Sequence, residues 1–138
     1  MPYLRTRVAV AVGLTLLIAG AAAGIIYEAA NERSQLRAHA AAATGGNPSR
    51  GEAMFIQYGC GSCHGLKHVR KASGAVGPSL DGVPVRAIIA GKLANSPANL
   101  QAWIRDPQRI SPGTAMPDLN VGERDARDIT AFLYTRAE

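Results

Sequence analysis

The stretch GCGSCHG, residues 59–65, holds both cysteines of this 138-residue chain, Cys60 and Cys63, with His64 directly after the second. Gly59 and Gly61 permit a tight turn, since glycine adopts backbone conformations that other residues avoid. Such a turn would let two thiols and one imidazole contact the same bound group. The stretch therefore predicts a site built from three adjacent side chains. The remainder of the fold has to be arranged around that site.

Several kinds of site use cysteine and histidine at such spacing. A disulfide or redox-active dithiol is one, but no βαβ pattern surrounds these thiols. Zinc would add His68 to the same three side chains and place four ligands within nine residues, too crowded for a tetrahedral ion. An iron–sulfur cluster needs four thiolates, and the chain has two. The pattern CxxCH is the attachment signature of c-type haem, which we favour, with dithiol and zinc as alternatives.

A haem held beneath by His64 leaves the sixth position of its iron to be filled. Met116 follows His64 by 52 residues and lies in a loop fixed by proline and glycine, so we expect its sulfur to bind the opposite face. Met54 and His68 lie too near the attachment stretch along the chain to reach that face. The alternative for Met116 is a methionine that fills core space.

The N-terminal segment predicts a membrane anchor, residues 1–27. An uncharged run of 20 residues, 8–27, follows Arg5 and Arg7, and as a helix it would span about 30 Å, the thickness of a bilayer core. The alternative is a secretory signal cleaved near Ala21–Ala23. In both cases the positive-inside rule keeps the arginines in the cytoplasm and places the rest of the chain outside it.

Residues 28–46 are rich in alanine and then glycine, which predicts a partly helical tether in which His39 is solvated. The domain proper is then 47–138. Aromatic residues make up only 5% of the chain. So few large apolar side chains favour a cofactor as part of the core. The net charge of +5 is not concentrated in stretches that interleave basic and aromatic residues, which argues against a nucleic-acid partner.

The domain is predicted to be all-α. No alternating strand pattern is present, whereas capping residues and apolar repeats at helical spacing recur. Long loops rich in glycine and proline, 65–85 and 108–120, separate the elements. We expect helices at 48–58, 85–91, 97–105 and 123–136.

Four motifs in this order resemble those of class I c-type cytochromes. They are GCGSCH, VGPSLDG, NLQAWIRDPQRISPGTAMP and ITAFL, within about residues 47–135. The chain most closely resembles membrane-anchored monohaem types, namely the cytochrome c domains associated with subunit II of haem-copper oxidases of the caa3 type. The resemblance implies the class I cytochrome c fold, three to five helices around one covalent haem, after a single transmembrane helix.

The resemblance also implies roles for individual residues. The first and last helices of the domain would cross through Gly51 and Phe55, against Ile129 and Phe132. For Arg86, whose implied place is near the haem propionates, the alternative is a surface side chain that contacts only solvent. The haem site would comprise thioethers at Cys60 and Cys63, axial iron ligands His64 and Met116, the carbonyl of Pro78 against His64, and Arg86 and Trp103 near the haem propionates.

The implied function is electron transfer and not enzymatic catalysis. We expect one haem c, a donor in a quinol-oxidising complex, and an acceptor in a haem-copper terminal oxidase. The location would be the bacterial inner membrane, crossed once, with the haem domain on the periplasmic face. The alternatives are a fixed haem-relay subunit of a larger respiratory complex and a five-coordinate haem sensor or peroxidase. The chain departs from mitochondrial cytochromes by a shorter stretch before the methionine loop and by fewer lysines, so their partner-docking surface does not transfer directly.

Overall fold

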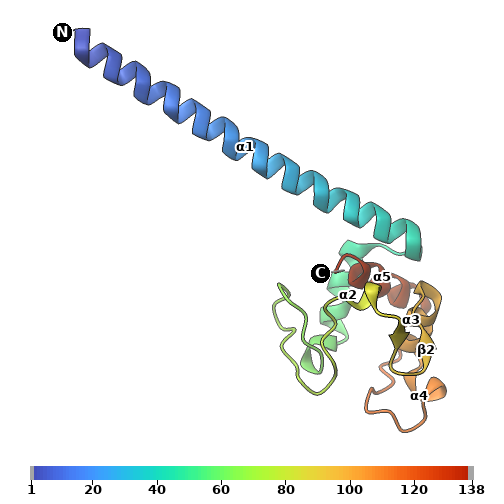
Figure 1. Cartoon of the computed structure of the whole chain (residues 1–138). Coiled ribbons are helices and arrows are strands. Elements are labelled where there is room, and N and C mark those ends of the chain that lie inside the picture. Colours follow the sequence, from blue (N-terminus) through green and yellow to red (C-terminus); the bar gives the residue numbers. More distant parts are fainter. Residues whose placement is uncertain (1, 137–138) are drawn as a thin grey trace. The chain divides into compact units, whose positions relative to one another are not determined.

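A computed structural model of the chain describes residues 2–136. It divides into two compact units, Met1–Gln35 and Leu36–Glu138, each considered by itself. The first unit belongs to a single long helix, α1, Pro2–Thr44 (Figure 1). Within the described residues, α1 is the one helix long and apolar enough to cross a membrane, judged by length and composition.

Helix α1 is continuous through the segment expected to be a partly helical tether. Alanine favours helix more than any other residue, so the alanine-rich composition sustains the helix. Its last residues, from Leu36, belong to the second unit, where Ala40 and Thr44 are buried. The carbonyl of Thr44 accepts a hydrogen bond from the Gln101 side chain at 3.0 Å. Gly45, at φ 71°, then ends the helix, as is common for glycine after a last turn.

Three helices of the second unit lie where the sequence predicted them, two from capping residues and the last from its apolar face: α2 Pro48–Gln57, α3 Pro97–Arg105 and α5 Glu123–Tyr134. The Asn47 side chain accepts the Arg50 backbone N–H at 3.0 Å, and the Ser96 side chain accepts that of Asn99 at 3.2 Å. Each cap satisfies a donor that the first turn leaves unpaired. A short helix, α4 Pro107–Ile110, occupies the start of the expected 108–120 loop, which is a correction to that prediction.

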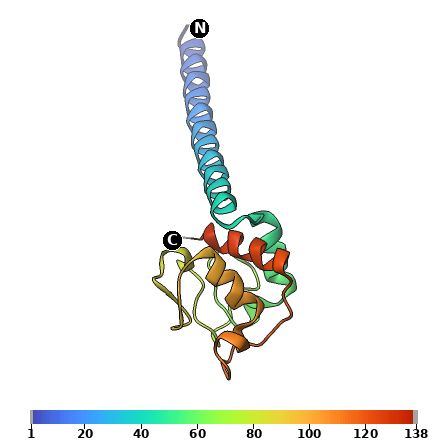
Figure 2. The ribbon, with the colours of Figure 1, turned by 90° about the vertical axis from the view of Figure 1, so that its right-hand side faces the viewer.

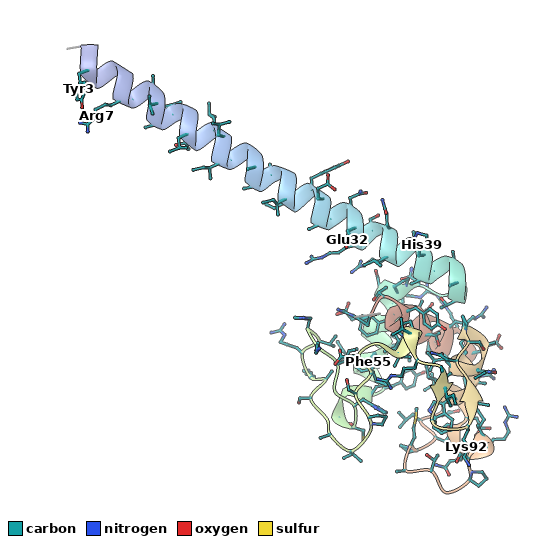
Figure 3. The ribbon with its side chains drawn as sticks, viewed as in Figure 1. Tyr3, Arg7, Glu32, His39, Phe55 and Lys92 are labelled. Atoms are coloured by element: carbon teal, nitrogen blue, oxygen red, sulfur yellow. The ribbon has the colours of Figure 1, made fainter. Side chains whose placement is uncertain are left out.

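The core forms where α5 lies against α2 and α3 (Figure 2). A Cβ at Gly51 would overlap the Asp128 carbonyl and crowd the Cβ of Phe132, so only glycine lets α2 approach α5 this closely. The rings of Phe55, labelled in Figure 3, and Phe132 then meet with their centroids 5.6 Å apart. This confirms the predicted helix crossing.

The prediction of a helix at 85–91 is wrong, whereas the predicted all-α class holds apart from one short hairpin. The segment forms a 3-10 turn, Val83–Val85, followed by a hairpin of β1, Ile88–Ile89, and β2, Leu93–Ala94. The strands are joined by residues 90–92, and the N–H of Lys92 donates to the Ile89 carbonyl at 2.9 Å across a turn whose central residues, Ala90 and Gly91, have φ of 50° and 68°. Positive φ at both central residues is typical of a type I′ turn, and β-branched isoleucines favour the strand that precedes it. The described fold is otherwise helical, as expected.

Candidate functional site

The CxxCH stretch forms a single 3-10 turn directly after α2. Gly59, at φ 71°, redirects the chain, and the turn Cys60–Ser62 follows. The carbonyl of Cys60 accepts the backbone N–H of Cys63 at 3.3 Å and that of His64 at 3.0 Å. Both thiols are free and partly buried. The turn therefore carries the two unbonded thiols and the imidazole on one short backbone segment.

The local chemistry argues against the two alternatives to haem. Burial raises the pKa of the Cys60 thiol to about 11, whereas a dithiol redox centre needs an accessible thiolate near neutral pH. Among residues 2–136, no three His, Cys, Asp or Glu side chains are grouped to hold a metal ion. A zinc site of three or four such ligands therefore has no support in the geometry.

The imidazole of His64 is fixed in both position and tautomer. Its Nδ1 lies 2.7 Å from the carbonyl oxygen of Pro78. A carbonyl only accepts, so Nδ1 carries the proton and Nε2 carries the lone pair that a metal would use. The structure gives Nε2 no hydrogen-bond partner among the described residues. A Cβ at Gly77 would overlap the ring, so glycine is needed beneath the imidazole.

A five-residue segment, 77–81, carries the Pro78 carbonyl, and we call it the strap. The strap lies against residues 63–67, which begin with the second cysteine. The N–H of Gly77 donates to the Cys63 carbonyl at 2.8 Å, and the N–H of Leu80 donates to the Gly65 carbonyl at 2.8 Å. These backbone bonds on either side of Pro78 align its carbonyl with His64.

Met116 lies in a loop that is held by one side chain. Gln108 donates from Nε2 to the carbonyls of Thr114 and Met116 at 2.8 and 2.7 Å, and its Oε1 accepts the N–H of Gly113 at 3.2 Å. Met116 is half-buried and packs against the core. Its sulfur is thus presented by a constrained loop, and its ligation of iron stays a prediction.

Arg86 and Trp103 are in different environments. Trp103 is buried in the core on α3. Arg86 is exposed, yet it is not simply solvated, because its Nη2 donates to the carbonyls of Ser79 and Asp81 at 2.6 and 2.8 Å. The approach of both residues to haem propionates stays a prediction.

The residues fit a covalently attached haem. The free thiols of Cys60 and Cys63 are the groups that would form thioethers, and the unpaired Nε2 of His64 is the nitrogen that would bind iron. Two large apolar side chains are exposed, Val76, directly before the strap, by 79% and Val85, directly before Arg86, by 72%. Such surface is available for an apolar group to cover.

Sequence reasoning missed four residues that hold the backbone of this domain in place. They act through hydrogen bonds to distant backbone groups, for which a single sequence offers little signal. The four are Asp81, Asn95, Gln108 and Asp128.

Comparison with known proteins gives a family and a group of relatives. The model of the family described as cytochrome c matches residues 48–137. Subunit 2 of cytochrome c oxidase from Alkalihalophilus pseudofirmus is 36% identical over 86 residues, which cover 62% of this chain and 24% of that protein. The same subunit of Bacillus subtilis is 32% identical over 83 residues, covering 56% of this chain and 23% of that protein.

A third relative, cytochrome c oxidase subunit 2 of Bacillus sp. strain PS3, is 37% identical over 68 residues, covering 48% of this chain and 19% of that protein. The chain thus spans about a quarter or less of the length of these curated relatives. No solved structure gives a significant match.

Proposed function

Because the chain belongs to the cytochrome c family, we propose that it is a membrane-anchored monohaem carrier that moves single electrons from a quinol-oxidising complex to a haem-copper terminal oxidase. The family and the oxidase relatives support a haem electron-transfer role in a respiratory chain. The observation that carries the proposal is the His64 imidazole, fixed by Pro78 on one nitrogen and unpaired on the other, beside two free thiols.

The chain's own residues would hold one haem c. Cys60 and Cys63 would form the two thioethers, and His64 would bind the iron through Nε2. When bound, the haem supplies a one-electron couple between ferric and ferrous iron. Met116 would provide the opposite ligand, presented by the loop that Gln108 holds.

Two iron ligands from the chain, His64 and Met116, would favour a carrier over an enzyme. With His64 and Met116 both bound, no position at the metal is left for a substrate or for a diatomic gas. Methionine as an axial ligand also raises the reduction potential, which suits a step near the end of a respiratory chain. The chain is therefore proposed to act as a carrier and not as a peroxidase or a sensor.

Helix α1 provides the proposed anchor. Its apolar run is exposed along its length in the structure, as a lipid-facing helix requires. Arginines precede this run, so the positive-inside rule places them in the cytoplasm of a bacterium and the haem domain on the periplasmic side of the inner membrane. The domain would then meet its partners close to the membrane surface, where tethering raises their effective concentration.

A second candidate function is a fixed relay within an oxidase assembly. The relatives favour it, because each of them is subunit 2 of a cytochrome c oxidase. Extraction in mild detergent followed by size separation distinguishes the two functions. A carrier should elute alone with its haem, whereas a fixed subunit should elute with oxidase subunits.

The proposed function is tested with the full chain produced in a bacterium that matures c-type cytochromes. We expect haem to stay attached after denaturation in the native chain and to be absent from a C60A/C63A variant. In membranes supplied with quinol, the native haem should be reduced by the quinol-oxidising complex and reoxidised when oxidase turnover begins. A native chain without covalent haem, or one whose haem stays unchanged through this cycle, would contradict the proposal.

A further inference from the structure

The strap, residues 77–81, presents the carbonyl that fixes the imidazole of His64. Backbone bonds to Cys63 and Gly65 hold the strap at Gly77 and Leu80. These bonds leave Ser79 and Asp81, on either side of Leu80, to be held by side chains. Two side chains do so: that of Asp81, which belongs to the strap, and that of Arg86, which follows it in the sequence.

The first is the carboxylate of Asp81 itself. Its Oδ1 accepts the backbone N–H of Lys67 at 2.9 Å, and its Oδ2 accepts the hydroxyl of Ser79 at 2.8 Å. The same hydroxyl oxygen accepts the N–H of Asp81 at 3.1 Å, which closes a small ring at the end of the strap. The donors from Lys67 and Ser79 hold the pKa of Asp81 below its ordinary value, so the group is ionised at neutral pH.

The second is the guanidinium of Arg86. Its Nη2 donates to the carbonyls of Ser79 and Asp81 at 2.6 and 2.8 Å. The backbone that carries Arg86 is held in turn by Asn95, whose Nδ2 donates to the carbonyls of Val83 and Arg86 at 2.7 and 2.8 Å. Arg86 therefore acts from a backbone that is itself held in place.

We propose that Asp81 is a positioning residue, assisted by Arg86, which holds the Pro78 carbonyl against His64 Nδ1 and thereby sets the electron affinity of the iron that His64 binds. The inference rests on the proposed function, because it needs His64 to be an iron ligand. It assigns to the strap a role beyond attachment, since the two side chains act at a distance from the metal through one backbone carbonyl.

The direction of the effect follows from the chemistry of the imidazole. A strong hydrogen bond from Nδ1–H to a carbonyl raises the basicity of Nε2, which favours the oxidised metal. If the Asp81 side chain is removed, the N–H of Lys67 loses its acceptor and the hydroxyl of Ser79 loses its bond to the carboxylate, so the strap is held less tightly. The bond from His64 to Pro78 then weakens, and the equilibrium shifts toward the reduced form.

Loss of a negative charge near the metal shifts the equilibrium in the same direction, so the experiment has to separate charge from position. Asp81→Asn removes the charge but keeps an oxygen that accepts the Lys67 N–H. Asp81→Ala removes both. Each full-length holoprotein is compared with the native one by its reduction potential and by the solvent exchange of the His64 Nδ1 proton in NMR spectra.

We expect D81N to keep the native exchange rate of the Nδ1 proton and to show only the shift due to charge. We expect D81A to exchange this proton at least severalfold faster and to favour the reduced form about threefold more than D81N does. Equal potentials for D81A and D81N, with native exchange in both, would overturn the inference while leaving the proposed function intact. A native chain that carries no covalent haem would overturn both.

A second pair of variants serves if D81A does not accumulate as a folded holoprotein. Arg86→Lys keeps a positive charge and a donor for the carbonyls of Ser79 and Asp81, whereas Arg86→Ala removes both. Faster exchange of the His64 proton in R86A than in R86K supports the inference. Native exchange in both variants contradicts it.

Discussion

The carboxylate of Asp128, only 1% exposed on α5, receives the guanidinium of Arg50 on α2 through two hydrogen bonds, of 2.6 and 2.9 Å. The same carboxylate accepts the backbone N–H of Asn47 at 2.7 Å. The residue therefore joins the start of α2 to the middle of α5, at the crossing that Gly51 makes close. An acid so placed is a structural group, and its ionisation is linked to folding.

Asp128→Asn is expected to destabilise the folded protein at neutral pH by about 2 kcal/mol, because hydrogen bonds to a charged group are lost or weakened. Burial alone would raise the pKa of Asp128, but the hydrogen bonds from Arg50 and Asn47 outweigh it and hold the pKa below its ordinary value. The stability that this group contributes is therefore present above the unfolded pKa, about 4, and is lost as pH falls through the folded pKa.

Denaturant unfolding of the holoprotein between pH 7 and pH 3 measures both effects. The native protein should lose stability over this range by more than D128N does. Asp118→Asn serves as the control, because Asp118 is exposed and an asparagine still accepts the Asn120 N–H that it binds. Parallel pH profiles for the native protein and D128N would contradict the role assigned to this carboxylate.

The elements that the sequence predicted correctly are those decided locally. Asn47 and Ser96 each precede a proline, and each caps the helix that follows, because a capping side chain needs only the N–H three residues on. The attachment turn was equally predictable, since CxxCH forms one turn by itself. The pairing of His64 with Pro78 came instead from the resemblance to a family, and the structure places the two atoms at 2.7 Å.

The elements that the sequence did not predict depend on contacts between distant segments. The 85–91 segment has the apolar spacing of a short helix, yet Asn95 binds the carbonyls of Val83 and Arg86 and so holds the chain in a hairpin. Gln108 likewise has a structural role only because its side chain donates to carbonyls in the methionine loop. Side-chain amides of this kind are common in sequences, and nothing in their spacing distinguishes these two.

Ala90→Gly is expected to stabilise the protein by about 0.5–1 kcal/mol. Ala90 has φ of 50°, a left-handed conformation that is unfavourable for any residue with a Cβ and is readily adopted by glycine. The matched control is Ala53→Gly on the exposed face of α2, which should destabilise by about 1 kcal/mol through lost helix propensity. Denaturant unfolding measures both, and effects of the same sign would contradict the turn geometry.

Gly77→Ala is expected to reduce the yield of holoprotein severalfold and to abolish the native signal of the His64 Nδ1 proton. The added Cβ would overlap the imidazole, so the ring has to move away from the Pro78 carbonyl. The cause is steric, because Gly77 is not among the glycines with positive φ. Gly122→Ala is the control, since Gly122 has φ of −64° and open space around it. Haem content per chain and NMR spectra test the pair, and a G77A protein with native values of both would disprove the close contact.

Met116→Ala is expected to convert a closed iron site into an open one. The oxidised native protein should show the weak far-red band of a sulfur-to-iron bond, and the variant should lack it. The variant should also bind CO when reduced and have a lower reduction potential, because methionine ligation favours the reduced form. The native protein should not bind CO.

Met54→Leu provides the matched control, because Met54 also packs against the core but lies before the attachment turn on α2. This variant should keep the far-red band and remain closed to CO. If M116A retains the band, another residue binds the iron and Met116 fills core space. If the native, undenatured protein binds CO, the five-coordinate alternative gains support, and a haem that binds gases would replace the carrier as the better account of this chain.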